Sequence, residues 1–600
     1  MEKILVLDFG GQYAHLIASR LRSLGFFAEI SLPQNFSLAI AKQRVIKGII
    51  LSGGPASVLA ADAPQLPLEI FACGKPILAI CYGFQLAIKI LGGKIKRGQV
   101  AEFGPTQLTQ ITPKKSAKIF HKLPQKFQVW MSHFDVVQSL PCTWQVLART
   151  PHCQFAAAET TNLWGVQFHP EVAHTEFGTK ILAKFAKCCG LAKNWSLKEF
   201  LQSEIQRIKK QVGSKKVFLL TSGGVDSTVA LALLQQALGP QKVFGLLIDT
   251  GLLRAGEAQA VLENFRKHGF QHLQLEKAAR HFLAALKNVS EPEAKRRIIG
   301  RVFVQVQRKV LRRLKFNTRE WLLGQGTIYP DTIESAGTKH ADLIKTHHNR
   351  VPEIAKMLAQ NLVVEPLKEL YKDEVRAIGR QLKLAPKLLQ REPFPGPGLG
   401  IRILCGETKP LAKGKSLAAT IQRKWQTKAR VLPLRSVGIQ GDQRTFHYPV
   451  ALFAPHFNLA KFVKLATSIL NHFVELNRVL LCLTASTPPR RFLTQKVFLT
   501  RDRIALCQRV DEQARQILAC SKVASKVWQM PVILAPISTT GDKESVILRP
   551  VESEEAMTAA AALFEPQILR QFAQGLTEFP EIEQVFLDLT NKPPGTIEWE

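Results

Sequence analysis

The sequence predicts an α/β multidomain protein, in which two parallel-sheet α/β domains precede a C-terminal α+β domain. Three observations lead to this prediction. The chain has 600 residues, 46% of them hydrophobic, which is too long for one core and ample for several. A short apolar strand, a glycine turn and a helical pattern occur in this order near the N-terminus and again after Lys215. The last third of the chain instead mixes short strands with helices.

The first α/β domain is predicted over residues 1–194. Its opening, KILVLDFGGQYAHLIASRLRSLG, contains a strand, a glycine turn and a helical period through Ile17, Leu21 and Leu24. The stretches GIILSGGP and PILAIC repeat the strand and turn, which favours a mostly parallel sheet. An amphipathic helix over residues 195–210 is then expected to lead into the next domain.

The second α/β domain is predicted over residues 195–391. It contains KKVFLLTSGGVDSTVALALLQQALG and KVFGLLIDTG, a strand, glycine loop, helix and strand in succession. Such a unit places the loop at the carboxyl edge of a parallel sheet, where ligands bind. The proline and glycine residues of REPFPGPGLGIRI exclude regular structure and mark the start of the third domain, residues 392–600.

Composition restricts the kind of protein. The sequence has no apolar run of the ~20 residues that cross a bilayer and no secretory signal pattern, so we expect a cytoplasmic protein without a membrane partner. Ten cysteines without a CxxC pair favour reduced thiols over a disulfide framework or a zinc site. The formal net charge of +34 is spread along the chain, which favours a generally basic surface with phosphate-binding pockets over a dedicated nucleic-acid surface.

Cys81 ends the run PILAIC, between a predicted strand over residues 76–80 and a helix that begins near Tyr82. A lone cysteine in an apolar run is usually a core residue, but a thiol on such a sharp turn is also placed to act as a nucleophile. In WGVQFHPEV, His169 and Glu171 alternate on a segment that is predicted to be strand-like. This spacing puts imidazole and carboxylate on one face, where Glu171 can orient His169 and His169 can take the Cys81 proton.

The glycines of ILSGGPASV allow a backbone N–H to approach a substrate, so the N–H groups of Gly54 and Tyr82 are predicted to form an oxyanion hole. With Cys81, His169 and Glu171, this pattern resembles the class I glutamine amidotransferase family over about residues 1–190. The resemblance implies a Cys81 nucleophile, a His169 general base and a Glu171 orienting residue, which together release ammonia from glutamine through a thioester. The chain departs from the family pattern at three positions, where glycine, arginine and a small residue are usual: Ala79, Ala101 and Phe134.

The loop SGGVDST follows a strand and opens a helix, so its backbone N–H groups form a cradle for an anion. It lacks the lysine of a Walker A loop, and a glycine-rich turn alone is equally compatible with a simple tight turn. Its SGGxDS pattern resembles the pyrophosphate loop of the N-type ATP pyrophosphatases. The resemblance implies that ATP is bound by Ser222, Gly223, Gly224, Val225, Asp226, Ser227 and Thr228. Asp226 is then a candidate ligand for Mg²⁺, the expected cofactor, because magnesium prefers carboxylate and phosphate oxygens.

A glycine-containing basic segment covers residues 324–349, GQGTIYPDTIESAGTKHADLIKTHHN, and includes Lys339 and Lys345. On its charges alone, a solvated basic loop is the simpler interpretation. In one chain with the pyrophosphate loop, it is predicted to be a lid that closes over phosphates.

Three polar segments stand out in the third domain: VGIQGDQRTFHYP, VWQMPVI and NKPPGTIEWE. Their arginine and lysine suit a phosphate, and their carboxyl and amide groups suit a base or ribose. Domain for domain and in motif order, the chain resembles the glutamine-hydrolysing GMP synthases. The resemblance implies that the last domain forms a homodimer and that XMP contacts Arg296, Asp442, Arg444, Gln529, Lys592 and Glu598. Glu392, before PFPGPGL, departs from the histidine that is usual there.

The resemblance also implies the reaction. XMP is adenylated by ATP and then aminated at C2 by ammonia from L-glutamine, which gives GMP, glutamate, AMP and pyrophosphate. The expected partners are these small molecules, with no nucleic acid. Two other classes stay open: an RNA-modifying adenylating enzyme, which would suit the basic charge, and a non-enzymatic binding protein on a decayed amidotransferase scaffold, which would be expected to have lost Cys81, His169 or Asp226.

Overall fold

The structure is a computed structural model that describes residues 1–11, 13–111, 118–329, 331, 357–389, 394–440, 443–553 and 558–600. It divides into two compact units, one comprising Met1–Ser196 with Ile439–Arg444, the other Leu197–Gly438 with Thr445–Glu600. No helix of the described residues is long and apolar enough to cross a membrane.

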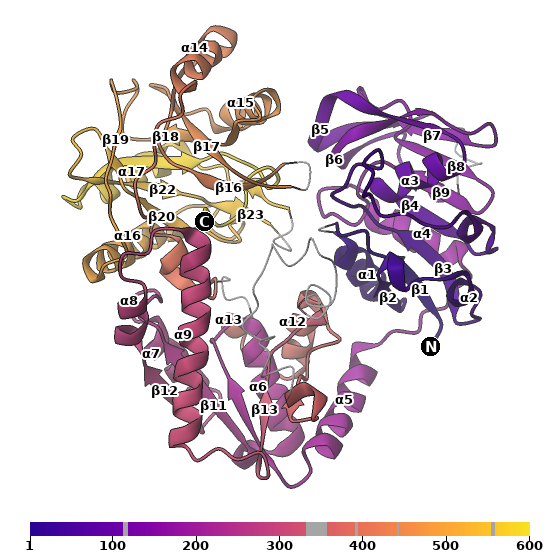
Figure 1. Ribbon diagram of the computed structural model, residues 1–600, viewed down its shortest axis with the longest axis horizontal. Coiled ribbons are helices and arrows are strands. Elements are labelled where there is room, and N and C mark those ends of the chain that lie inside the picture. Colours follow the sequence, from indigo (N-terminus) through magenta and orange to yellow (C-terminus); the bar gives the residue numbers. More distant parts are fainter. Residues whose placement is uncertain are drawn as a thin grey trace. The chain divides into compact units, whose positions relative to one another are not determined.

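The first unit is built on a nine-stranded sheet in the order β2-β1-β3-β4-β9-β8-β7-β5-β6 (Figure 1). The five strands β1–β4 and β9 pair in parallel, as the strand–glycine–helix pattern predicts. The rest of the sheet pairs in antiparallel fashion, which was not predicted. The elements are β1 (Lys3–Leu7), α1 (Ala14–Ser23), β2 (Ala28–Ser31), α2 (Leu38–Ala41), β3 (Ile46–Leu51), β4 (Ile77–Ile80), α3 (Tyr82–Ile90), β5 (Lys94–Gln110), β6 (Lys126–Ser139), β7 (Gln145–Arg149), β8 (Ala157–Thr160), β9 (Leu163–Val166) and α4 (Gly178–Cys188), with short 3₁₀ turns at Pro33–Asn35 and Leu68–Ala72.

The strands β3 and β4 explain where two of the predicted site motifs lie. Their sequences, IKGIIL and ILAI, are almost entirely buried, as expected for parallel strands that are covered on both faces. Both strands end at the same edge of the sheet, since they run in parallel. The SGGP turn after β3 and Cys81 after β4 therefore meet at that edge.

The second unit begins with a parallel five-stranded sheet in the order β12-β11-β10-β13-β14. Chain order reverses beside β10, so the loop after β10 lies at a topological switch point, the usual ligand site of such sheets. The elements are α5 (Leu197–Val212), β10 (Lys216–Leu220), α6 (Val225–Leu238), β11 (Val243–Asp249), α7 (Glu257–Lys267), β12 (Leu273–Lys277), α8 (Ala279–Ala285), α9 (Pro292–Arg313), β13 (Trp321–Gly324), β14 (Val363–Val364), α12 (Lys372–Gln381) and α13 (Pro386–Leu389), with a 3₁₀ turn, η3, at Pro240–Lys242.

The same unit contains a mixed sheet in the order β15-β17-β18-β25-β22-β20, with β16 paired to β17. Its elements are a 3₁₀ turn, η6 (Gly398–Ile401), α14 (Gly414–Trp425), β15 (Lys428–Val431), β16 (Ser436–Gln440), β17 (Gln443–Phe453), α15 (Leu459–His472), β18 (Leu476–Cys482), α16 (Arg501–Ala519), β20 (Val532–Ala535), β22 (Glu544–Leu548), α17 (Pro566–Thr577) and β25 (Ile582–Asp588). Short pairs form between β19 (Leu493–Thr494) and β21 (Ile537–Ser538), and between β23 (Val551–Glu552) and β24 (Ala560–Ala561).

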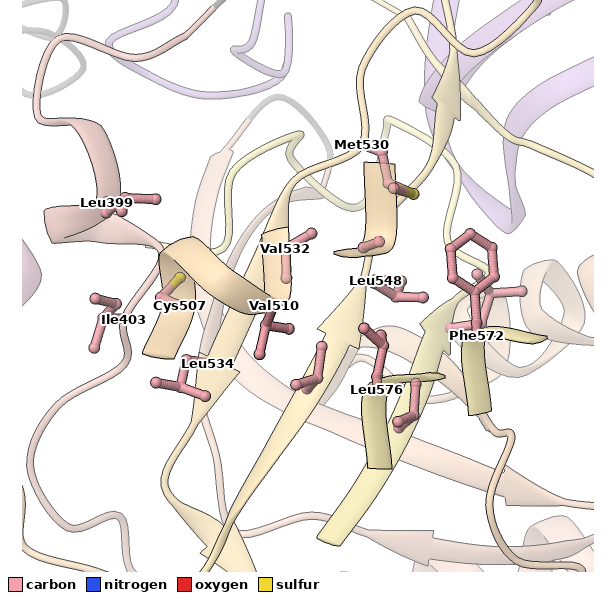
Figure 2. Packing of buried hydrophobic residues seen from close by; sticks show 14 of the residues in the cluster. Leu399, Ile403, Cys507, Val510, Met530, Val532, Leu534, Leu548, Phe572 and Leu576 are labelled. Carbon is pink, nitrogen blue, oxygen red and sulfur yellow. The ribbon is translucent and has the colours of Figure 1, made fainter. Parts of the chain in front are cut away.

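One hydrophobic cluster joins both sheets of the second unit. It includes Phe218 and Leu246 of the parallel sheet and Val450 and Leu548 of the mixed sheet. Figure 2 shows part of this cluster, with Leu399 and Ile403 on one side, Phe572 and Leu576 of α17 on the other, and side chains of α16 and the mixed sheet between them. The predicted boundary at residues 391/392 between a second and a third domain stays a prediction, since these two parts share a core.

Candidate active site

Cys81 lies on a sharp turn between β4 and α3. Its backbone φ of 50° and ψ of −106° fall outside the helical and strand regions, so the surrounding structure must stabilise this conformation. Gly83 allows the turn, because a Cβ there would approach the backbone oxygen of Leu51 to 2.6 Å. The predicted junction of strand and helix at this cysteine is confirmed, and the residue is 5% exposed.

His169 and Glu171 complete the predicted triad. His169 Nδ1 and Glu171 Oε1 are 2.8 Å apart, and both side chains are buried. Burial alone would lower the pKa of His169, but the charges of Glu171 and Cys81, and hydrogen bonds to both, raise this pKa well above its ordinary value. A charged imidazolium beside Cys81 favours the thiolate that attacks a carbonyl.

The prediction that His169 and Glu171 lie on a strand-like segment is wrong. β9 ends at Val166, and both residues lie in the turn that follows. The turn is held by backbone contacts instead: His169 N donates to Trp130 O at 3.0 Å, and Thr175 Oγ1 donates to His169 O at 2.7 Å. The imidazole and carboxylate therefore meet through the turn rather than through strand alternation.

The SGGP turn lies against the triad. A Cβ on Gly53 would approach His169 Cε1 to 2.9 Å and Cys81 Cβ to 3.7 Å, and a Cβ on Gly54 would approach Tyr82 Cγ to 3.2 Å. The predicted oxyanion-hole residues, Gly54 and Tyr82, are thus neighbours. Only glycine permits the backbone to come this close, which is the arrangement that backbone N–H donors to an oxyanion require.

Two glutamines extend this site and were not predicted. Gln85 Nε2 donates to Gln167 Oε1 at 3.2 Å, and Gln167 Nε2 donates to Cys81 Sγ at 3.6 Å. Both glutamines are buried, so this chain of amides restricts where the sulfur can lie. The sequence places Gln85 and Gln167 within the motifs CYGFQ and GVQFHPE, next to the triad residues, and this position could have identified them.

A second polar cluster lies on β5, β6 and the loop after β7. Single ligand atoms of Glu102, His133 and Cys153 all lie within 4.8 Å of one another, a set that could hold a metal ion. The Glu102 carboxylate already has two partners within the protein: His133 Nε2 is 3.2 Å from Glu102 Oε2, and Thr150 Oγ1 donates to Glu102. Burial and the charge of Glu102 raise the pKa of Cys153 to about 12, which keeps this thiol protonated at neutral pH.

The structure describes the surroundings of two of the three residues that depart from the amidotransferase pattern. Ala79 is buried in β4, within the hydrophobic cluster of the first unit. Phe134 lies beneath Arg97, whose guanidinium carbon is 4.8 Å from the ring centroid. The side chain of Ala101 is not among those the structure describes.

Glu171→Gln should shift the pH dependence of the glutamine hydrolysis that the amidotransferase resemblance implies. The substitution removes the charge that raises the pKa of His169, so this pKa should fall. The imidazolium is lost as pH rises through the pKa of His169, so the alkaline limb of the kcat/KM profile should move to lower pH, with kcat/KM at pH 8 reduced at least ~tenfold. Glu176→Gln, in the same turn but exposed, is the control; an unmoved limb in the Glu171 variant would contradict the assigned role.

The predicted ATP loop lies between β10 and α6. Gly223 has a φ of 72°, and Gly224 is the N-cap of α6. The hydroxyls of Thr221 and Ser222 accept hydrogen bonds from the N–H groups of Gly223 and Gly224, and Thr228 Oγ1 donates to Gly224 O at 2.8 Å. The seven residues Ser222–Thr228 therefore form a defined turn at a helix N-terminus, which suits an anion such as a phosphate.

Asp226 offers a carboxylate at this loop. Its Oδ1 atom is buried without a hydrogen bond among the described residues, and its Oδ2 atom is 3.8 Å from Lys372 Nζ of α12. This donor set fits Mg²⁺ bound to a nucleotide, since Mg²⁺ prefers carboxylate oxygens. Lys372 was not predicted, because it is 146 residues from Asp226 in the sequence and belongs to no motif.

The predicted XMP residues fall in several places. Gln529 Nε2 donates to Glu598 Oε1 at 3.4 Å, and the guanidinium of Arg296 donates to the backbone oxygen of Glu600. Lys592 pairs through its backbone with Ala559, and Arg444 is exposed near the start of β17. The structure thus brings Gln529 into contact with Glu598, and it holds Arg296 against Glu600. Glu598 and Glu600 both belong to the C-terminal tail, residues 591–600. Asp442, Glu392 and the two lid lysines, Lys339 and Lys345, lie outside the described residues.

The fold and the triad of the first unit define a class I glutamine amidotransferase. The family description "Glutamine amidotransferase class-I" matches residues 5–188, "NAD synthase" matches residues 195–359, and "GMP synthase C terminal domain" matches residues 516–599.

Whole-chain relatives define the family more closely. A probable GMP synthase [glutamine-hydrolyzing] from Leptospira interrogans is 41% identical, over 100% of this chain and 99% of its own. The GMP synthase [glutamine-hydrolyzing] from Thermobifida fusca is 36% identical, over 100% and 98%, and that from Thermomicrobium roseum is 42% identical, over 81% and 95%. The chain belongs to the glutamine-hydrolysing GMP synthase family.

Proposed function

We propose that this chain converts XMP to GMP, with ATP as the activating substrate and glutamine as the nitrogen donor. The observation that carries the proposal is the buried triad of Cys81, His169 and Glu171 in one chain with the pyrophosphate loop, Ser222–Thr228. Neither rival class needs both sites intact. The sequence identity to glutamine-hydrolysing GMP synthases, which extends along the whole chain, supports the same substrates.

In the proposed glutaminase half-reaction, the Cys81 thiolate attacks the side-chain amide carbon of glutamine. The N–H groups of Gly54 and Tyr82 stabilise the resulting oxyanion. His169 donates a proton to the departing nitrogen and ammonia leaves, which produces a thioester on Cys81. His169 then removes a proton from water, which attacks the thioester and releases glutamate.

In the proposed synthetase half-reaction, the O2 atom of XMP attacks the α-phosphorus of ATP and pyrophosphate departs into the loop of Ser222–Thr228. The XMP oxygen now belongs to an adenylate, so AMP can leave when ammonia attacks C2. Bound Mg²⁺ would neutralise phosphate charge, and Asp226 would hold it. Ammonia is mostly protonated in neutral water, so transfer without release to solvent is part of the proposal.

Lys339 and Lys345 belong to the glycine-containing basic segment that follows the pyrophosphate loop in the sequence, and from that composition they are proposed to close over the phosphates of ATP. The remaining residues take the roles that the family resemblance implies. XMP is proposed to contact Arg296, Asp442, Arg444, Gln529, Lys592 and Glu598. We also propose that the chain is a homodimer through its C-terminal part and that it works in the cytoplasm, in guanine nucleotide biosynthesis.

An assay with XMP, ATP and Mg²⁺ tests the function. We expect GMP formation with glutamine and also with an ammonium salt, and exchange of labelled pyrophosphate into ATP only when XMP is present. Exchange that depends on tRNA instead of XMP would support the RNA-modifying alternative. Salt-sensitive binding to duplex DNA or RNA without ATP turnover would support the binding-protein alternative.

A further inference from the structure

A buried arginine, Arg402, makes two hydrogen bonds to the carboxylate of Glu598. Its Nε atom donates to Glu598 Oε2 at 3.0 Å and its Nη2 atom to Oε1 at 2.7 Å. The side chain of Arg402 is fully buried, whereas that of Glu598 is 17% exposed. The paired donors of a guanidinium fix the plane of a carboxylate as well as its position, which a lysine cannot do.

Arg402 is itself fixed. Its residue ends the 3₁₀ turn η6, its backbone oxygen accepts from Leu534 N of β20 at 2.9 Å, and its guanidinium lies 4.9 Å from the ring centroid of Phe394. The arginine therefore belongs to the rigid core of the unit rather than to a surface loop. Glu598 takes its position from this arginine.

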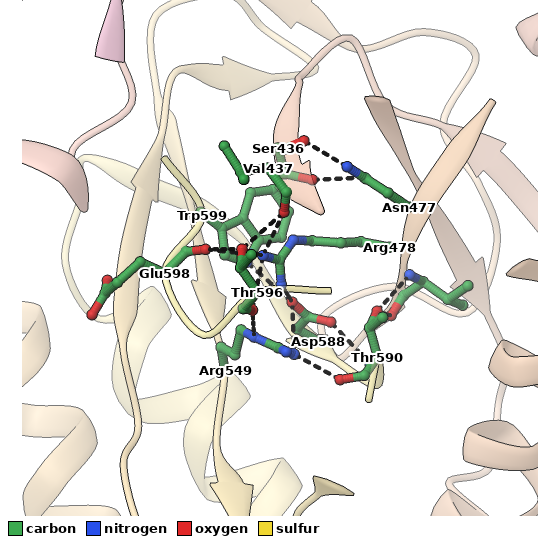
Figure 3. Close-up of polar contacts among 11 residues, drawn as sticks. Ser436, Val437, Asn477, Arg478, Arg549, Asp588, Thr590, Thr596, Glu598 and Trp599 are labelled. Atoms are coloured by element: carbon green, nitrogen blue, oxygen red, sulfur yellow. Dashed lines mark hydrogen bonds and ion pairs between the residues drawn. The ribbon is translucent and has the colours of Figure 1, made fainter. Parts of the chain in front are cut away.

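The backbone around Glu598 is also held, by a second buried arginine. Arg478 Nη2 donates to the backbone oxygens of Thr596 at 2.9 Å and Glu598 at 3.0 Å (Figure 3). The ring of Trp599 lies against the same guanidinium, 4.9 Å away, and Trp599 Nε1 donates to Asp588 Oδ2 at 3.0 Å. With the neighbouring residues fixed and the carboxylate paired with Arg402, the Glu598 side chain has little freedom left.

The end of the tail contacts α9, the helix that precedes β13 of the parallel sheet in the same unit. Lys295 of α9 is fully buried, pairs with the Glu600 carboxylate and donates to Ile403 O at 3.1 Å. Its neighbour Arg296 donates to the Glu600 backbone oxygen. The tail thus connects α9 with the segment that contains Arg402.

We propose that Arg402 is a positioning residue for XMP, which orients the Glu598 carboxylate to accept an N–H group of the purine base. A carboxylate has about four acceptor positions; Arg402 uses two of them and Gln529 approaches a third, so Glu598 can still accept from a ligand. This inference rests on the proposed function. A surface carboxylate without such support would have to be ordered when the nucleotide binds, which weakens binding.

Arg402→Lys tests the proposal, because it keeps the charge and loses the paired hydrogen bonds. We expect the KM for XMP in the ammonium-dependent reaction to rise at least ~tenfold, while kcat at saturating XMP, the KM for ATP and glutamine hydrolysis change less than ~threefold. Arg207→Lys is the matched control: Arg207 makes a comparable two-bond pair with Glu204 on α5, and the KM for XMP should not change.

A double-mutant cycle adds a readout that a merely structural role would not move. Glu598→Gln alone should also raise the KM for XMP, and the double variant should resemble it, since Arg402 acts through Glu598. If Arg402→Lys does not fold, Phe394→Leu is the substitute variant, because it loosens the Arg402 guanidinium without removing a hydrogen bond. The KM for XMP should then rise about two- to fivefold, the effect expected from the loss of one cation–π contact.

Three results would overturn the proposal: an unchanged KM for XMP in folded Arg402→Lys, a fall in kcat at unchanged KM, or additive effects in the cycle. An unchanged KM in Phe394→Leu, where that variant replaces Arg402→Lys, would do the same. These results differ from failure of the proposed function, in which the wild-type protein would form no GMP from XMP.

Discussion

Cys81→Ala should abolish glutamine-dependent GMP formation and leave ammonium-dependent formation intact. The variant loses the sulfur atom that is proposed to form the thioester, while the pyrophosphate loop and the tail around Glu598 belong to the other compact unit. Removal of a nucleophile that acts with a base typically costs at least ~10³-fold in rate. Steady-state rates with glutamine and with ammonium chloride, measured on one preparation, give both values.

The control for this prediction is Cys142→Ala. Cys142 is an exposed free thiol in the same unit, so its loss should leave both rates unchanged. Equal rates with glutamine in wild type and Cys81→Ala would show that another group performs the hydrolysis. Loss of both activities in Cys81→Ala would show that the synthetase reaction also needs this cysteine.

Asp588→Asn should have the largest effect on stability. The Asp588 carboxylate contacts two fully buried arginines, Arg478 at 2.8 Å and Arg549 at 3.2 Å, and accepts from Trp599 (Figure 3). Burial lowers the pKa of Arg478 to about 9, which reflects the cost of keeping two cations there, and burial would raise the pKa of Asp588 if both arginines did not lower it. Without this anion, two buried charges lose their counterion, which costs about 3–5 kcal/mol.

Urea unfolding of the second unit, followed by tryptophan fluorescence, measures this loss. Glu581→Gln is the matched control: it breaks an exposed pair with Arg509, whose side chains are 44% and 52% exposed, and should cost less than about 1 kcal/mol. Because the same cluster holds the tail, Asp588→Asn should also raise the KM for XMP. A variant as stable as the Glu581 control would show that the arginines do not depend on Asp588.

Most of the candidate site could be predicted from local sequence. The Cys81 turn, the SGGP turn and the SGGVDST loop each combine a strand, glycines and a helix start within a few residues, and such short-range patterns determine the local backbone directly. The triad was predictable because its members lie in two compact motifs. The turn at His169 was misassigned, since alternation over three residues does not distinguish a strand from a turn held by distant backbone groups.

The support around these motifs could not be predicted. Arg402 and Glu598 are 196 residues apart, and Lys295 and Glu600 are 305 apart. A buried arginine has no periodic signal, and the chain has 81 lysine and arginine residues from which to choose. The antiparallel half of the first sheet was also missed, because its strands lack the glycine turn and helix that identify a parallel unit.

The fate of the glutamine amide nitrogen tests the central proposal most directly. The wild-type protein would be incubated with XMP, ATP, Mg²⁺ and glutamine labelled with ¹⁵N at the side-chain amide, in the presence of unlabelled ammonium at a concentration too low to support the reaction. Mass spectrometry should find the label in most of the GMP, at the exocyclic amino group of C2. GMP that carries mainly unlabelled nitrogen, or glutamate and labelled ammonia formed without GMP, would contradict the proposal that one chain couples the two reactions.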